Sequence, residues 1–155
     1  MAAYSFQTHW QFHAPLEDVW KLVSDPDRWP AWWRGVEKVE TITQGDANDI
    51  GTVKRYTWKS KLPYRLVFDM RTTRIVRHSV IEGAASGELA GTGVWTFTHA
   101  NGTTFVRYDW NVDTTKRWMN ALAPIARPFF QWNHDVVMEW GRHGLERRLA
   151  AFGGY

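Results

Sequence analysis

The sequence predicts one α+β domain in which a long C-terminal helix packs against an antiparallel sheet of about seven strands. Three observations predict this class. Segments between residues 36 and 112 alternate apolar and polar side chains with the period of a strand. Two short amphipathic helices are indicated after a first strand, and residues 129–152 carry a helical pattern that would span about 36 Å. A length of 155 residues suits a single domain covering residues 1–155.

The N-terminal segment predicts a strand and then two short helices. Residues 4–12 alternate, and one side of the strand carries Phe6, Thr8, Trp10 and Phe12. Pro15 followed by apolar residues at helical spacing predicts a helix over residues 16–23. Asp25-Pro26 begins a second short helix. That helix carries Trp29, Trp32 and Trp33, which either form a gate to a pocket or anchor the helix to the core.

Six further strands are expected, at residues 36–43, 52–58, 64–75, 77–84, 92–98 and 104–112. The alternation in the strand over residues 64–75 breaks before Ile75, which indicates a β-bulge or bend. Asn101-Gly102 predicts a two-residue hairpin turn, because both residues tolerate positive φ. Arg107 and Asp109 alternate with apolar neighbours and are expected to face solvent. Arg55 and Glu82 would point inward only if the phase of their strands is the opposite one.

The C-terminal part of the chain changes to a helical period. Residues from about 115 to 123 have a helical pattern, and we expect Pro124 and Pro128 to interrupt it before the long helix. Gly141 and Gly144 each lower the stability of that helix by about 1 kcal/mol relative to alanine. Either close packing against another element or space for a ligand would explain these glycines.

Composition and charge narrow the possible functions. The chain has 11 Trp, 8 Phe and 5 Tyr residues, which suit either an organic-ligand pocket or a core of large side chains. The net charge is +3, but basic residues alternate with acidic ones near the C-terminus, so no nucleic-acid partner is expected. No apolar run approaches the about 18 residues of a membrane span, and no secretory leader pattern is present. The expected location is cytoplasmic.

The sequence carries no motif for metal or cofactor binding. The sequence has no cysteine, which excludes disulfides and thiolate chemistry. Its six histidines lack the spacing of a helical zinc motif, so no metal site is expected. Gly91-Thr92-Gly93 lacks the third glycine of a dinucleotide fingerprint, and no phosphate-binding loop occurs. We therefore expect no cofactor.

Four segments carry a resemblance to a known family. They are APLEDVW at residues 14–20, DPDRWPAWW at 25–33, GELAGTGVW at 87–95 and NHDVVMEWGRHGL at 133–145. In this order they make the whole chain resemble the START-like (SRPBCC) superfamily with its helix-grip fold, and within it the polyketide cyclase/dehydrase-like branch. The resemblance implies a curved sheet wrapped around the C-terminal helix, with a cavity between them. It does not fix a reaction, because the superfamily includes both enzymes and carriers.

The expected occupant of the cavity is a small apolar or aromatic molecule, lipid-like or polyketide-like. The expected lining residues are Trp10, Phe12, Trp29, Trp32, Trp33, Phe68, Trp95, Tyr108, Trp110, Val137 and Trp140. Asn133 and His134 begin two adjoining stripes of the long helix, so at least one of them is expected inside.

Three classes of function remain open. The first is a ligand-binding protein, in which Asn133 and His134 are buried polar residues bonded to the sheet backbone. The alternative is a cofactor-independent cyclase or dehydratase, in which His134 transfers protons and Asn133 holds an oxyanion. A third is a protein-interaction module that uses the surface of residues 29–33.

Overall fold

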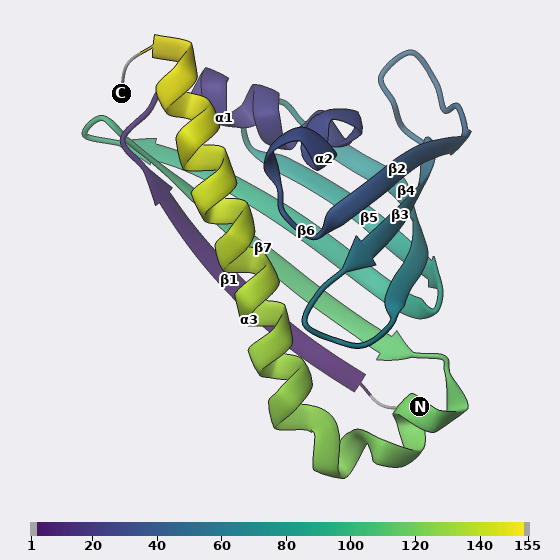
Figure 1. Cartoon of the computed structure of the whole chain (residues 1–155). Helices are drawn as coiled ribbons and strands as arrows, with labels where there is room; N and C mark the ends of the chain where they lie inside the picture. Colours follow the sequence, from purple (N-terminus) through teal and green to yellow (C-terminus); the bar gives the residue numbers. More distant parts are fainter. Residues whose placement is uncertain (1–2, 154–155) are drawn as a thin grey trace.

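The computed structural model describes residues 3–153. Its elements follow in the order β1 (Ala3–Phe12), α1 (Leu16–Val23), the 3₁₀ turn η1 (Pro26–Arg28), α2 (Trp29–Trp32), β2 (Val36–Thr43), β3 (Val53–Lys59), β4 (Arg65–Val76), β5 (Val80–Gly87), β6 (Leu89–Ala100), β7 (Thr103–Thr114) and α3 (Arg117–Gly153). Within these residues one antiparallel sheet has the strand order β1-β7-β6-β5-β4-β3-β2. The sheet curves around α3, and α1 and α2 lie near the C-terminal end of that helix (Figure 1). The predicted α+β, helix-grip class is therefore confirmed.

Local turn chemistry sets the register of the sheet. Asn101 and Gly102 both have positive φ, at 53° and 77°, and they join β6 to β7 with Ala100 opposite Thr103. This is the predicted two-residue hairpin. The pairing of β4 with β5 shifts between Thr72 and Arg74, which is the irregularity expected before Ile75.

Strand alternation separates a concave apolar face from a convex polar face. On the concave face Phe6 pairs with Trp110 and Trp10 pairs with Val106. On the convex face the Arg107 guanidinium pairs with Asp109, at 3.0 Å between Nε and Oδ2, as the alternation predicts. Arg55 is exposed and pairs with Asp69, at 2.8 Å. The inward orientation considered for Arg55 is therefore wrong.

The prediction that Pro124 and Pro128 interrupt the C-terminal helix is wrong. α3 continues from Arg117 to Gly153 with both prolines inside it, although its first turns bend (Figure 1). Each proline removes one helical N–H donor, which bends a helix without having to end it. Water can reach this half of the helix, where Leu122, Ile125 and Phe129 are exposed.

The second half of α3 approaches α2 very closely at two glycines. A Cβ atom on Gly144 would overlap the backbone carbonyl of Trp32, and one on Gly141 would lie 2.5 Å from the Trp33 ring. Close packing therefore explains both glycines. The indole Nε1 of Trp33 donates to the carbonyl of Val137 on α3, at 2.9 Å, and joins the two helices.

The tryptophans of α2 and its C-terminal cap are core residues. Trp29, Trp32 and Trp33 are all buried, at 8 % exposure or less. The Trp29 ring lies 4.9 Å from Trp33 and 6.1 Å from Trp95, centroid to centroid. These three tryptophans therefore do not form an exposed interaction surface. Within residues 3–153, no helix is both long enough and apolar enough to cross a membrane.

Candidate functional site

Two cavities lie on the concave face of the sheet. The larger, of about 580 Å³, lies between β3–β6 on one side and α1, η1 and residues 48–52 on the other. The smaller, of about 150 Å³, lies between the sheet and the first half of α3, and we call it the apolar cavity. The apolar cavity occupies the position expected for a ligand between sheet and helix.

The apolar cavity has a wall of large hydrophobic side chains with few polar groups. From the sheet come Phe6, Leu66, Trp110 and Val112, and from α3 come Met119, Phe130, Val137 and Met138. The polar members include Tyr64, Thr114, Asn133 and His134. Burial raises the pKa of the Tyr64 phenol to about 12, so the group stays neutral, and its hydroxyl donates to the Sδ atom of Met119, at 3.9 Å. Such a lining suits an aromatic or aliphatic molecule that carries a small number of oxygen atoms.

An aromatic wall separates the two cavities. Trp29, Trp58, Phe68, Trp95 and Tyr108 line both of them. Tyr108 stacks on Trp95, with ring centroids 4.1 Å apart. Gly93 makes room for this stack, because a Cβ atom there would lie 2.6 Å from the Tyr108 hydroxyl.

The two polar residues singled out on α3 both reach the apolar cavity. The Oδ1 atom of Asn133 accepts a hydrogen bond from the backbone N–H of Lys61, at 3.2 Å, which leaves its NH₂ group as a donor. The His134 ring stacks on Phe6, with centroids 4.2 Å apart. Burial lowers the pKa of His134 to about 4, so the imidazole is neutral at pH 7.

Three residues in the wall of the apolar cavity carry buried polar atoms without a hydrogen-bond partner among the described residues. They are the hydroxyl of Tyr4, the indole Nε1 of Trp58 and Nδ1 of His134. For His134 the nearest carboxylate oxygen, on Asp135, is 3.8 Å away, which is beyond hydrogen-bond distance. Buried polar atoms without partners are rare, so a ligand group that forms hydrogen bonds with them would remove an energetic penalty.

We expect acid to destabilise the protein through His134. The pKa of His134 is near 6.5 in the unfolded chain and about 4 in the folded one. The contribution of the neutral His134 ring to the free energy of unfolding is therefore complete above pH 6.5 and falls as the pH drops toward 4. His134→Phe keeps the ring stack and removes the titration. The free energy of unfolding of the wild type, relative to that of this variant, should therefore fall by about 2–3 kcal/mol between pH 7 and pH 4. Urea denaturation of both proteins at each pH measures it, and a pH-independent difference would contradict the prediction.

The structure brings most of the predicted site residues to the cavities. Trp29, Trp33, Phe68, Trp95, Tyr108, Trp110, Asn133, His134 and Val137 line the apolar cavity. Trp10, Phe12, Trp32 and Trp140 line neither cavity and have to be corrected. The first three are buried in the closed core, where α1, α2 and the second half of α3 cover the sheet. Trp140 lies on the flank of α3, where the Arg34 guanidinium stacks on its ring at 4.3 Å.

Sequence reasoning missed several residues of the apolar cavity. Tyr4 and Trp58 carry two of its unpartnered donors. Tyr4 has the same strand phase as Phe6, so extending the alternation by one step would have included it. Trp58 was missed because no residue of its strand was assigned to the cavity. Met119 was missed because the segment before Phe129 was not expected to continue the long helix. Phe130 lies within the predicted helix but was not assigned to its inward side.

The chain is similar to a known protein family in sequence and to known structures in fold. Residues 4–152 match the family described as polyketide cyclase / dehydrase and lipid transport. No curated protein sequence matches the chain. The structure is similar to the Zhui aromatase/cyclase from Streptomyces sp. R1128, with a TM-score of 0.78 and 18 % identity over 99 % of this chain and 100 % of that chain. It is also similar to a START superfamily protein from Mycobacterium smegmatis, with a TM-score of 0.77 and 13 % identity over 96 % and 98 %. At these identities the likeness concerns the fold.

Proposed function

The chain belongs to the polyketide cyclase / dehydrase and lipid transport family, and from this premise we propose that it binds a small aromatic or lipid-like molecule in the apolar cavity. The observation that carries the proposal is a hydrophobic wall with three unpartnered polar atoms, on Tyr4, Trp58 and His134. These groups suit a ligand with an apolar ring or chain and one or two oxygens of a phenol, ketone or ester.

The larger cavity could hold the part of a ligand that is too long for the apolar cavity. It shares the aromatic wall and adds charged side chains from β3 and β5, Lys54 and Glu82. The Nζ atom of Lys54 pairs with Asp27 at 2.7 Å, and Glu82 pairs with Arg74 at 3.2 Å. We infer that a ligand places its apolar part against α3 and any polar end in the larger cavity.

Ligand binding can be tested with an environment-sensitive dye such as an anilinonaphthalene sulfonate. We expect a Kd in the micromolar range, about −8 kcal/mol of binding free energy or somewhat weaker. Val137→Trp should fill the apolar cavity and weaken binding by about tenfold or more, about 1.4 kcal/mol. Val136→Trp is the matched control, because this neighbouring position lines neither cavity. Equal affinities for the two variants would place the dye outside the apolar cavity and contradict the proposal.

An enzyme of cyclase or dehydratase type is the second candidate, and the shared position of His134 and Asn133 in the apolar cavity favours it. A neutral imidazole can accept a proton from an activated carbon, and the Asn133 amide can donate to the resulting enolate oxygen. With a linear poly-β-carbonyl substrate, His134→Ala should lower the appearance of aromatic absorbance by about 100-fold. Dye affinity should change much less, because the apolar wall that binds the dye remains. If His134→Ala and Asn133→Ala only lose stability, the residues are structural and the carrier function stands.

A further inference from the structure

One apolar stripe on the first half of α3 faces solvent. It consists of Trp118, Leu122, Ile125, Phe129 and Trp132. Their spacing of four, three, four and three residues puts them on one side of the helix. Ile125 is 83 % exposed, and the other four are 45–48 % exposed. Scattered apolar residues on a surface need no explanation, but five on one helix side form a continuous patch of the kind found at interaction sites.

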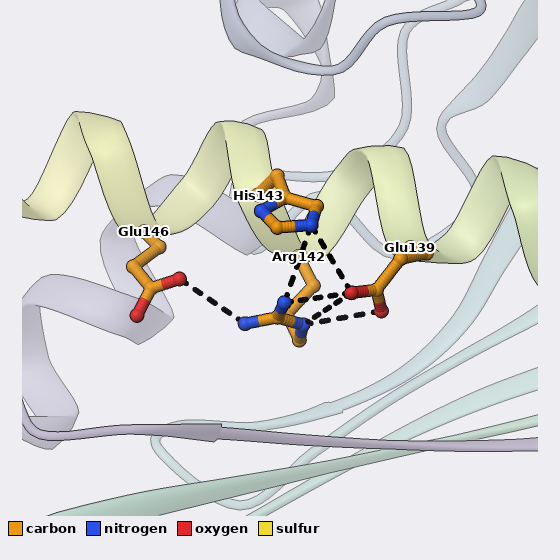
Figure 2. A network of polar contacts seen from close by, with 4 residues as sticks. All are labelled: Glu139, Arg142, His143 and Glu146. Atoms are coloured by element: carbon orange, nitrogen blue, oxygen red, sulfur yellow. Dashed lines mark hydrogen bonds and ion pairs between the residues drawn. The ribbon is translucent and has the colours of Figure 1, made fainter.

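The charges of this segment all have one sign. Residues 114–134 include Lys116, Arg117 and Arg127 and no acidic residue. The second half of α3 differs, since Glu139, Arg142, His143 and Glu146 form a balanced network on its solvent side (Figure 2). Arg142 bonds to both glutamates, at 2.6 Å and 3.1 Å. Lys116 pairs with Glu88 at 2.8 Å, whereas Arg127 donates to the carbonyl of Ala3 and keeps its charge. Arg117 and Arg127 therefore leave a net positive charge beside the exposed stripe, which complements a negatively charged partner.

The chemistry of the stripe distinguishes among possible partners. A second copy of this chain would bring one net positive segment against another, which like charges oppose. The bend at Pro124 and Pro128 also prevents the straight seam that paired helices need. A bilayer surface accepts a bent helix, and tryptophan and phenylalanine favour its interfacial region.

We propose that residues 117–132 of α3 dock on the surface of an anionic lipid bilayer. The apolar stripe would insert among the headgroups, parallel to the membrane plane, while Arg117 and Arg127 meet the lipid phosphates. Other side chains of the same segment, Met119 and Phe130, line the apolar cavity. Docking would therefore bring the apolar cavity next to the bilayer, in which an apolar molecule dissolves. This last step rests on the proposed function, but the docking itself does not.

Co-sedimentation of the full chain with lipid vesicles tests the docking without any ligand. We expect binding to vesicles of phosphatidylcholine with phosphatidylglycerol, and at least about tenfold weaker binding to phosphatidylcholine alone. Salt should weaken the first interaction. Ile125→Glu should lower affinity for the mixed vesicles by about tenfold or more, because it replaces an inserted side chain by a charge. The matched control is Ile42→Glu, at another exposed isoleucine on β2, which should bind as wild type does.

Three outcomes would overturn the proposal. The first is absence of binding to the mixed vesicles, and the second is equal loss of binding in the Ile125→Glu and Ile42→Glu variants. The third is a concentration-dependent dimer that Ile125→Glu dissociates, measured by analytical ultracentrifugation, together with no vesicle binding. That result would assign the stripe to a second copy of the chain. Dye affinity of Ile125→Glu, measured in parallel, reports on the proposed function separately.

Discussion

Replacing Trp33 by alanine should lower the free energy of unfolding by about 3–5 kcal/mol, the usual range for a buried aromatic truncated to alanine. Trp33 is 2 % exposed and packs against Trp10, Trp29, Trp32, Trp58 and Trp95. Its indole N–H also bonds to Val137 on α3. The variant loses apolar burial, leaves a void and breaks one link between α2 and α3. Urea denaturation followed by fluorescence measures the change.

Two further variants separate the causes of this loss. Trp33→Phe keeps a ring in the cluster and loses the hydrogen bond, so we expect a smaller destabilisation than for alanine. Trp132→Ala removes an indole that is 47 % exposed and should change stability by less than about 1 kcal/mol. A gate would behave in the opposite way. If Trp33→Ala changed the rates of dye binding and release with little loss of stability, Trp33 would be a gate rather than an anchor.

Gly144→Ala should destabilise the protein by about 3 kcal/mol or more, although alanine is the better helix former by about 1 kcal/mol. The added methyl group would overlap the backbone carbonyl of Trp32. A backbone carbonyl cannot rotate away as a side chain can, so α2 and α3 must separate. Thermal or urea unfolding of the variant measures both the sign and the size of the change in the free energy of unfolding.

Gly141→Ala provides a graded comparison on the same helix. Its methyl group would meet the ring of Trp33 rather than a backbone atom, at 2.5 Å. A ring can shift within the cluster, so we expect a smaller loss than for Gly144→Ala. An increase in stability for either variant would mean that the close approach of α2 and α3 is not maintained in solution.

Much of the fold follows from local patterns in the sequence. Alternation along residues 4–12 and 104–112 assigns inward and outward side chains that the β1–β7 pairing then repeats, from Tyr4 with Val112 to Phe12 with Thr104. The Asn101-Gly102 turn fixes the register of β6 and β7. The prolines of α3 were predicted incorrectly because a proline can bend a helix without ending it, and a local pattern does not distinguish the two outcomes.

The candidate site could be predicted only in part. Periodicity tells which face of a strand a residue belongs to, but not how far along that face the open space lies. Trp10 and Trp95 share the concave face, with ring centroids 5.5 Å apart, yet only Trp95 borders a cavity. The difference arises because α2 packs over one end of the face, and that packing depends on glycines more than 100 residues away. Contacts at such sequence separation are invisible to local patterns.

The cluster of indoles around Trp33 also has an optical consequence. Trp10, Trp29, Trp32, Trp33, Trp58 and Trp95 form a continuous array in which neighbouring ring centroids lie 4.9–6.4 Å apart. At such separations the electronic transitions of adjacent chromophores couple, and excitation energy passes from one indole to another. The circular dichroism of the folded chain then contains aromatic exciton bands beside those of the backbone. Helix content read from the far-ultraviolet spectrum alone would be biased, whereas the same bands report directly on whether the core is assembled.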